Sequence, residues 1–387
     1  MTLFNSSART APAIRKLQLQ DFRSYEQLSL DLGNAMFLAL CGENGAGKTN
    51  ILEAISLFAP GKGLRRADQS ELARAAGPGN FAISMELDCD LGRVRLGTGS
   101  NPDGGSGRRH RVDREPVGSA RAFADYARII WLTPSMDGLF MGPAGDRRRF
   151  LDRLVLAVDC DHGARVSSLE KALRNRNRLL EDRAADSSWL DAAEREIAEI
   201  AIAVTIARSE TIERLRHLIE ESKTQDSPFP WAEISLQGEL DELVRTRPAL
   251  EAEERYRAAL KDNRRRDAAA GRTLVGPQST DLRVFHGPKQ SEAGRCSTGE
   301  QKALLVGLVL AHAHLVRSSS GLAPITLLDE VMAHFDPKKR RALFSILEQI
   351  GCQVWVTGAD PQAFEDMPQS GATILVSSGK AEIAKFG

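Results

Sequence analysis

The sequence is poor in cysteine, has no long hydrophobic run and carries no excess of charge of either sign. Its five cysteines are scattered and include no C-x-x-C pair, so we expect reduced structural thiols rather than a zinc site or a redox couple. No segment reaches the roughly eighteen apolar residues that span a membrane, and residues 1–10 lack the apolar core of a signal peptide. We therefore expect a cytoplasmic protein with no membrane partner.

Lysine and arginine together number 52, as do aspartate and glutamate, so the formal net charge is zero. This balance excludes a uniformly basic nucleic-acid binder, but it leaves local basic clusters such as residues 147–149 and 264–266. With 387 residues, of which 42% are hydrophobic, the chain is long enough for two or three domains with packed cores.

Residues 42–49 read Gly-Glu-Asn-Gly-Ala-Gly-Lys-Thr and fit the phosphate-loop pattern G-x-x-x-x-G-K-[ST] between an apolar strand and a helix. Glycines let backbone N–H groups approach a triphosphate, Lys48 can reach its β- and γ-phosphates, and the Thr49 hydroxyl can ligate Mg²⁺. The alternative is a glycine-rich turn that binds nothing. The residues expected to hold ATP here are Gly42, Asn44, Gly45, Ala46, Gly47, Lys48, Thr49 and Asn50.

Hydrophobic patterning divides the chain into three parts. Residues 1–149 read mainly as strands, including a hairpin over 81–96, a polar loop over 97–108 and a buried strand at 129–132. Residues 150–271 read as helices, the longest over 188–222 and begun by a serine cap, and residues 272–387 alternate strand and helix. We expect an α/β ATPase domain, 1–149 and 272–387, interrupted by a helical insert, 150–271.

Residues 325–328 form an apolar strand that ends in two carboxylates, Asp329 and Glu330. In a phosphate-loop ATPase, Asp329 would hold Mg²⁺ through water and Glu330 would orient or deprotonate the attacking water. Glu330 and Lys48 are therefore the expected catalytic residues. The alternative is a turn with solvated carboxylates.

Residues 297–301 read Ser-Thr-Gly-Glu-Gln and open an apolar helix, and Ser297 and Glu300 have capping-box spacing. The run resembles the signature motif of ABC-type ATPases, in which a serine, a glycine and a helix N-terminus meet the γ-phosphate bound by a second subunit. The resemblance implies that Ser297 and Gly299 complete the nucleotide site of a partner copy. The plainer interpretation is an ordinary helix cap.

The order of these motifs resembles the ABC-type ATPases of chromosome maintenance and, within them, the RecF family of bacterial recombinational repair. Residues 19–25, 42–54, 147–152, 173–180 and 276–282 are similar to motifs of that family. The resemblance implies an ABC-type head with a mixed β-sheet and a slow, DNA-stimulated ATPase. It also implies an ATP-dependent homodimer that binds double-stranded DNA near single-strand gaps and works with RecR and RecO in loading RecA.

The same resemblance points to DNA contacts by Arg147, Arg148 and Arg149, and by Arg176 in the run 173–180. The plainer alternative for the second run is a solvated helix face on which Arg174, Arg176 and Arg178 pair with nearby carboxylates.

Three departures from the family pattern bear on activity. Gln278 and Ser279 replace the usual histidine and arginine, and the signature has Thr298 and Glu300 where glycine or arginine and glutamine are common. Thr357 lies where many ABC ATPases place a switch histidine, so we expect slow hydrolysis.

Other classes of protein fit less well. A transporter ATPase subunit does not need the long helical insert, and an SMC or Rad50 protein has far longer coiled-coil arms. No acceptor-site motif supports a kinase or small-molecule transferase. A non-catalytic, nucleotide-gated adaptor that recruits protein partners through the helical insert stays open as the alternative function.

Overall fold

The computed structural model describes residues 11–101, 107–182, 186–223 and 227–386. The chain forms two compact units, which are described separately here: Met1–Asp137, Gln225–Phe229 and Leu305–Gly387 make the first, and Gly138–Thr224 and Pro230–Leu304 make the second. Both predicted boundaries of the helical insert, 150 and 271, fall inside the second unit. The three-part division of the chain stays a prediction.

The first unit contains a six-stranded sheet with the strand order β15-β14-β3-β13-β12-β8. All neighbours in it are parallel except the edge pair β14 and β15. The central strand β3 is buried along its whole length, as its continuous apolar sequence predicts. The strands are β3 (Phe37–Cys41), β8 (Ile129–Leu132), β12 (Ile325–Leu328), β13 (Val354–Gly358), β14 (Gly371–Ser377) and β15 (Lys380–Phe386).

A second six-stranded sheet, entirely antiparallel, has the order β2-β1-β4-β5-β6-β7. The predicted hairpin is confirmed as β4 and β5, but the predicted loop over 97–108 is wrong at its start. There β5 continues to Ser100, because Thr98, Gly99 and Ser100 pair with the basic strand β6. The strands are β1 (Ala13–Phe22), β2 (Tyr25–Asp31), β4 (Ala82–Cys89), β5 (Gly92–Ser100), β6 (Arg108–Val112) and β7 (Glu115–Val117).

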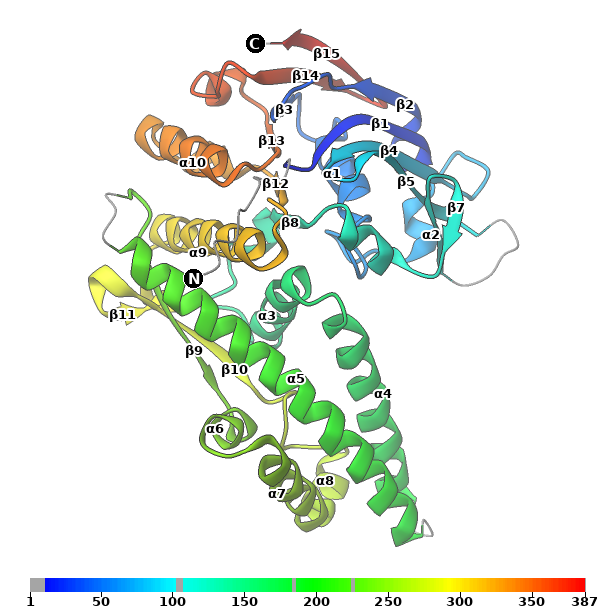
Figure 1. Cartoon of the computed structure of the whole chain (residues 1–387), viewed down its shortest axis with the longest axis vertical. Coiled ribbons are helices and arrows are strands. Elements are labelled where there is room, and N and C mark those ends of the chain that lie inside the picture. Colours follow the sequence, from blue (N-terminus) through cyan, green and yellow to red (C-terminus); the bar gives the residue numbers. More distant parts are fainter. Residues whose placement is uncertain (1–10, 102–106, 183–185, 224–226, 387) are drawn as a thin grey trace, which may run out of the picture. The chain divides into compact units, whose positions relative to one another are not determined.

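Helices cover both faces of the parallel sheet of the first unit (Figure 1). Helix α1 (Lys48–Ser56) lies on one side of the sheet and α10 (Pro337–Ile350) lies on the other. The short helix α2 (Gln69–Leu72) follows α1 in the sequence. The rings of Phe37 and Phe344 meet edge to face with centroids 5.7 Å apart, which fixes α10 against β3.

Helix α9 (Thr298–Ser320) joins the helices on the α10 side with its later turns. It is the one helix of the described residues that is long and apolar enough to cross a membrane by length and composition alone. Most of its apolar side chains are buried within the fold, including Leu304, Leu308, Ala313 and Val316.

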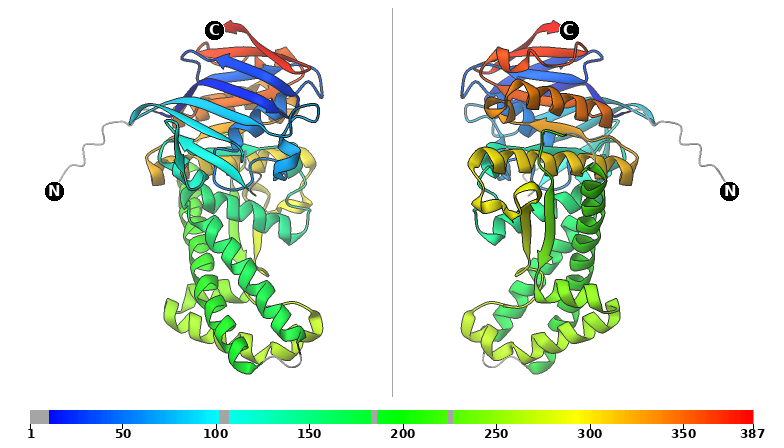
Figure 2. Two further views of the ribbon diagram at one scale, coloured as in Figure 1. Left: turned by 90° about the vertical axis from the view of Figure 1, so that its right-hand side faces the viewer. Right: turned by 90° about the vertical axis from the view of Figure 1, so that its left-hand side faces the viewer.

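The second unit is built on the long helices α4 and α5, which run side by side (Figure 2). Its core contains Leu169 and Leu173 of α4 and Ile197 and Ala201 of α5. The predicted serine cap of α5 is wrong, because the cap residue is Asp186, whose carboxylate accepts a hydrogen bond from the N–H of Ser188. The helices are α3 (Ala144–Val158), α4 (His162–Glu181), α5 (Ser187–Ser222), α6 (Glu239–Thr246), α7 (Ala249–Asp262) and α8 (Arg264–Ala270).

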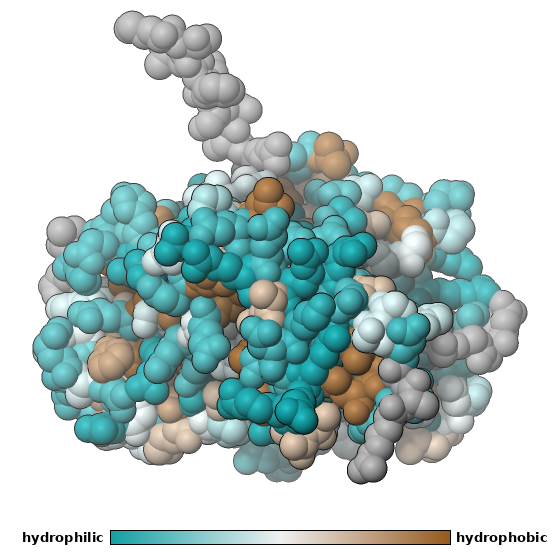
Figure 3. Space-filling model, turned by 90° about the horizontal axis from the view of Figure 1, so that it is seen from below, coloured by the Kyte–Doolittle hydropathy of each residue, from teal (hydrophilic) through white to brown (hydrophobic). Residues whose placement is uncertain are grey.

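A three-stranded antiparallel sheet, β11-β10-β9, completes the second unit. Its strands are β9 (Ala232–Gln237), β10 (Asp281–His286) and β11 (Ser291–Glu292). The face drawn in Figure 3 is mostly hydrophilic, with small hydrophobic patches scattered among the polar residues. Partly buried apolar side chains on this scale are ordinary for a folded protein.

Candidate nucleotide-binding site

The phosphate loop connects β3 to α1, as the sequence predicts. Two of its glycines have a structural requirement that no other residue meets. Gly47 has φ 110°, in the left-handed region, and a Cβ atom on Gly42 would lie 2.1 Å from the carbonyl oxygen of Val376. The loop therefore keeps its backbone bare, with Asn44 and Gly45 exposed and Ala46 buried beneath them.

Lys48 is folded over the loop rather than extended into solvent. Its side chain is part of a residue only 4% exposed, and Nζ donates to the carbonyl oxygens of Gly42 at 2.7 Å and Glu43 at 2.9 Å. The ammonium group thus lies beside the backbone that a phosphate-binding loop presents to its ligand. This is the position from which a lysine neutralises phosphate oxygens.

Four residues meet at the carboxyl ends of β12 and β13: Thr49 of α1, Thr357 of β13, and Asp329 and Glu330, which follow β12. The Thr49 hydroxyl donates to Asp329, with distances of 2.9 Å to Oδ1 and 3.1 Å to Oδ2. The Thr357 hydroxyl donates to Asp329 Oδ1 at 2.7 Å and accepts from the Glu330 backbone N–H at 2.9 Å. The fold therefore brings Thr49 and Asp329 together, as predicted, and adds Thr357 as the residue that positions the buried carboxylate.

Glu330 has a different environment from its neighbour. Its backbone has φ 53°, a left-handed conformation that is uncommon for a non-glycine residue, and its side chain is exposed while Asp329 is buried. This turn directs the two carboxylates to different surroundings. Asp329 is fixed by two hydroxyls, and Glu330 remains accessible to a water molecule.

The donors at this site suit Mg²⁺. Hydroxyl and carboxylate oxygens are the ligands that Mg²⁺ takes from a phosphate-loop protein, with phosphates and waters supplying the rest. Thr49 Oγ1 and the Asp329 carboxylate are the two protein oxygen donors here, already within 3.1 Å of each other. No cluster of three or more His, Cys, Asp and Glu side chains suited to a metal occurs among the residues that the structure describes.

The role of Thr357 can be tested by replacing it with valine, which keeps the shape and removes the hydroxyl. We expect the buried Asp329 to lose a donor and the Glu330 N–H to lose its acceptor, at a cost of about 1–3 kcal/mol of stability. Hydrogen–deuterium exchange should show faster exchange of the Glu330 amide in Thr357→Val. Thr357→Ser, which keeps the hydroxyl, is the control and should protect this amide. Equal protection in both variants would contradict the positioning role.

A second group of residues supports the loop from below. The Tyr25 hydroxyl donates to the Gly47 carbonyl at 3.1 Å, and burial raises the pKa of this tyrosine, so the donor proton is retained. The buried Glu53 of α1 pairs with Arg23 at 2.6 Å and with Arg65 at 2.9 Å. The turn that contains Arg65 is therefore tied to α1 by an ion pair.

The signature residues lie at the start of α9, in the second unit. Ser297, Thr298 and Gly299 are exposed, and a Cβ atom on Gly299 would meet nothing within 4 Å. The predicted capping box is confirmed, because Ser297 N–H donates to Glu300 Oε2 at 3.0 Å and the Glu300 N–H points back to Ser297 Oγ. The exposed helix start is free to meet another molecule.

Glu300 does not leave its negative charge unbalanced at this helix start. Its carboxylate pairs with Lys289, and this pair, followed by the hydrogen bonds from Ser297, lowers the pKa of Glu300 to about 2. The glutamate therefore stays ionised and is neutralised locally.

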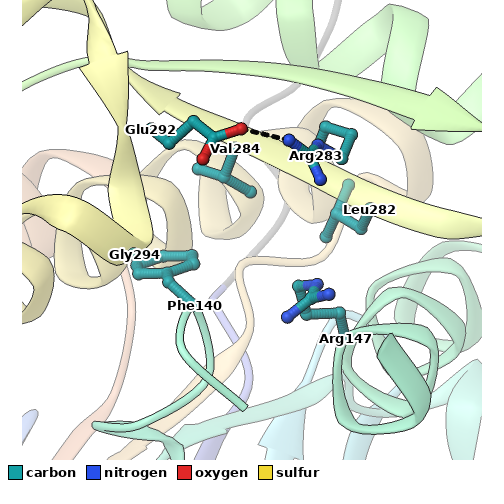
Figure 4. A pocket seen from close by; sticks show the side chains of 7 residues that line it. All are labelled: Phe140, Arg147, Leu282, Arg283, Val284, Glu292 and Gly294. Atoms are coloured by element: carbon teal, nitrogen blue, oxygen red, sulfur yellow. Dashed lines mark hydrogen bonds and ion pairs between the residues drawn. The ribbon is translucent and has the colours of Figure 1, made fainter. Parts of the chain in front are cut away.

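The arginines at 147–149 differ in exposure. Arg147 makes a two-point ion pair with Asp281, at 2.7 and 2.8 Å, and its side chain is only 15% exposed. Arg148 is half-buried and donates to the Thr280 carbonyl, and Arg149 is 56% exposed beside Asp146. Figure 4 shows Arg147 on the wall of a small pocket of about 80 Å³, opposite the Arg283–Glu292 pair. Of the three, Arg149 is the most exposed.

The prediction that Arg176 contacts DNA is wrong. Arg176 is fully buried, and its guanidinium donates to Glu194 at 3.0 Å, Asp267 at 2.7 Å, the Thr273 hydroxyl at 2.8 Å and the Leu260 carbonyl at 2.6 Å. Each of its three guanidinium nitrogens is engaged, and complete burial keeps the side chain away from a phosphate in solution. Arg176 is a structural ion-pair residue that holds α4, α5, α7 and α8 together.

The phosphate loop, the buried Asp329 and the parallel sheet that carries them define an ABC-type ATPase head. A family model described as an AAA domain matches residues 16–87. Proteins named DNA replication and repair protein RecF, from Brucella abortus and Mesorhizobium japonicum, are each 50% identical to the chain, over 369 and 367 residues. These matches cover 95% of the chain, and 95% and 96% of the two relatives. The chain belongs to the RecF family of DNA replication and repair proteins.

Solved structures confirm the predicted fold class. A structure of the recombination mediator protein RecF of the RecFOR pathway matches with a TM-score of 0.85 at 19% identity, covering 98% of this chain and 100% of that one. An Smc head domain from Pyrococcus furiosus matches with a TM-score of 0.52 at 18% identity, covering 96% of each chain.

Proposed function

We propose that the protein is an ATP-dependent DNA-binding protein of recombinational repair, in which ATP joins two copies into a clamp on duplex DNA near single-strand gaps. Slow hydrolysis of ATP then releases the DNA. In this role the protein acts in the cytoplasm with RecR and RecO and assists the loading of RecA. Membership of the RecF family supports the pathway, and one of the similar solved structures is of RecF with ATP.

The observation that carries this proposal is the network of Thr49, Asp329, Thr357 and Glu330 beside Lys48. It combines a phosphate-binding loop after β3 with a buried and an exposed carboxylate after β12, and Thr357 lies on β13, the strand between these two. Bound Mg²⁺, held by Thr49 and Asp329, would neutralise the phosphate oxygens. In the proposed mechanism, Glu330 orients or deprotonates the attacking water, and Lys48 binds the β- and γ-phosphates.

Dimerisation through nucleotide is supported by the exposed start of α9. In the proposed dimer, Ser297, Gly299 and the N–H groups of this helix start meet the γ-phosphate bound by the partner copy. Removal of the γ-phosphate removes that contact and opens the clamp. Contacts of exposed arginines, Arg149 among them, with DNA phosphates would be independent of sequence and sensitive to salt.

The alternative is a nucleotide-gated adaptor that does not hydrolyse ATP and that recruits protein partners. Thr357 at the position of the switch histidine favours this alternative. The exposed Glu330 and the Asp329 carboxylate, which is held by two hydroxyls, favour hydrolysis. We therefore keep the hydrolysing clamp as the proposed function.

The test is the mass of the protein in solution with no nucleotide, with ADP and with ATP, each with and without a duplex that contains a single-strand gap. We expect ATP, and not ADP, to produce a dimer that gapped duplex stabilises. Ser297→Arg should prevent dimerisation, since the bulky cation projects from an exposed position at the helix start. Ser187→Arg, at the exposed start of α5, is the control and should dimerise normally.

A mass that does not depend on nucleotide would reject the clamp and leave Ser297 as a helix cap. A dimer that forms with ATP but persists without turnover would favour the adaptor.

A further inference from the structure

A groove of about 1280 Å³ runs over the second unit between α5, β9 and α6. This volume exceeds the roughly 300–1,000 Å³ of typical small-molecule pockets. Apolar side chains from all three elements line it: Ile206 and Ile212 from α5, Leu236 from β9 and Val244 from α6. All four side chains are at least half-buried, so they form the apolar floor of the groove.

The charged residues around this floor are mostly acidic. Five carboxylates and three arginines line the groove. Two of the arginines are engaged, Arg216 with Glu213 and Arg245 with Glu242. Glu210, Glu239 and Asp241 form no ion pair with any residue in the described part of the chain, so the groove retains an excess of negative charge.

Asp241 is the most unusual of these carboxylates. It is 5% exposed, and it accepts one hydrogen bond, 2.6 Å from the Thr280 hydroxyl to Oδ2. Its Oδ1 atom is buried and has no hydrogen-bond partner within the described residues. Gly238 leaves room for the carboxylate, since a Cβ atom there would lie 2.2 Å from Asp241 Oδ2.

Such an arrangement costs free energy as it stands. A buried acceptor that has no donor raises the free energy of the folded state, because its hydrogen bonds to water are lost. The increase is larger for a buried carboxylate that has no cation beside it. Burial raises the pKa of Asp241, against the lowering effects of the Thr280 hydrogen bond and the Arg208 charge. A cationic donor supplied from outside would meet both needs.

We propose that this groove binds a peptide segment of a partner protein in which an arginine or lysine is flanked by apolar side chains. The cation reaches Asp241, and the apolar neighbours cover Ile206, Leu236 and Val244. The acidic excess selects for a basic segment and against anionic partners such as nucleic acid or an acidic lipid surface. The groove lies within the second unit and contains none of the nucleotide-site residues of the first, so the inference does not depend on ATP chemistry.

The test uses the full-length chain without nucleotide and measures fluorescence anisotropy of fluorescein-labelled peptides. The probe peptide has a central arginine between leucines and serines at both ends. Matched peptides carry citrulline, which keeps the shape without the charge, or glutamate at the centre. We expect the arginine peptide to bind at least about tenfold more tightly than the citrulline peptide, and the glutamate peptide not to bind.

Two variants locate the binding. Asp241→Asn keeps the shape and should remove the preference for arginine over citrulline. Ser235→Arg, at an exposed position of β9 that lines the groove, should abolish binding of the arginine peptide by repulsion. Glu254→Gln removes an exposed carboxylate of α7 outside the groove and should bind as the unaltered chain does.

The proposal is overturned if none of the peptides binds, if arginine and citrulline peptides bind equally, or if Asp241→Asn retains the preference. It is also overturned if Ser235→Arg changes the mass of the protein in solution without peptide, since the groove would then be occupied by a second copy of this chain. Loss of ATP-dependent dimerisation alone leaves these peptide measurements unaffected.

Discussion

Replacing Glu330 by glutamine is expected to lower ATP turnover by at least about 100-fold and to hold the ATP-bound dimer on DNA. Glutamine has the same size, so the turn at φ 53° and the hydrogen bond from the Glu330 N–H to Thr357 are preserved. What is lost is the ability to accept a proton from water. Nucleotide binding by Lys48 and Thr49 should be unchanged, because neither residue contacts the Glu330 side chain in the hydrogen bonds of the described chain.

Turnover and mass in solution should be measured together, with gapped duplex present. Glu382→Gln is the control, since it removes an exposed carboxylate from β15 of the same unit and should leave both quantities unchanged. Turnover at the normal rate in Glu330→Gln would remove this residue from catalysis. Slow turnover with normal return to monomer would separate hydrolysis from release and contradict the clamp.

Replacing Arg176 by leucine is expected to destabilise the protein by about 3–5 kcal/mol, the largest structural effect we foresee. The change leaves Asp267, which is fully buried, without its ion-pair partner. Glu194 keeps Arg264, so the damage centres on Asp267. Lysine should not rescue the stability, because one ammonium cannot replace a guanidinium that bonds to four partners.

The control is Arg174→Leu, two residues away on the same helix. Its side chain is 69% exposed and makes only a 3.9 Å contact with Glu170, so its removal should change stability by no more than about 0.5 kcal/mol. Thermal unfolding and salt-dependent DNA affinity should be measured for both variants. If Arg176→Leu unfolds as the unaltered chain does but binds DNA more weakly, Arg176 is a DNA contact after all.

The nucleotide site could be read from the sequence because its parts are local. The phosphate loop depends on a short run of residues whose glycines the backbone requires, and Asp329 ends a strand that is recognisable by its apolar run. The partnership of Thr49 with Asp329 follows from the shared architecture of phosphate-loop proteins. For Thr357 the sequence showed only that the residue replaces a common histidine. Its hydrogen bond to Asp329 could not be predicted, because that contact depends on β13 lying beside β12.

The burial of Arg176, which contradicts the predicted DNA contact, could have been inferred from its helical spacing. A helix turns about 100° per residue, so a residue two positions from Arg174 lies on the opposite side. Arg176 is three residues after Leu173 and seven after Leu169, which places it on the apolar face. The groove at Asp241 had no such signal, since its unpaired oxygen depends on how α5, β9 and α6 pack.

The strand that ends in the phosphate loop is made early on the ribosome, but both of its neighbours are made late. Phe37 of β3 pairs with Val354 on one side and with Gly371 on the other. The second unit, which ends at Leu304, emerges in full before either neighbour is synthesised. Because domains fold as units during synthesis, a nascent chain stalled ahead of β13 would carry a folded second unit and no functioning phosphate loop. Competence to bind nucleotide is therefore among the last properties that the growing chain acquires.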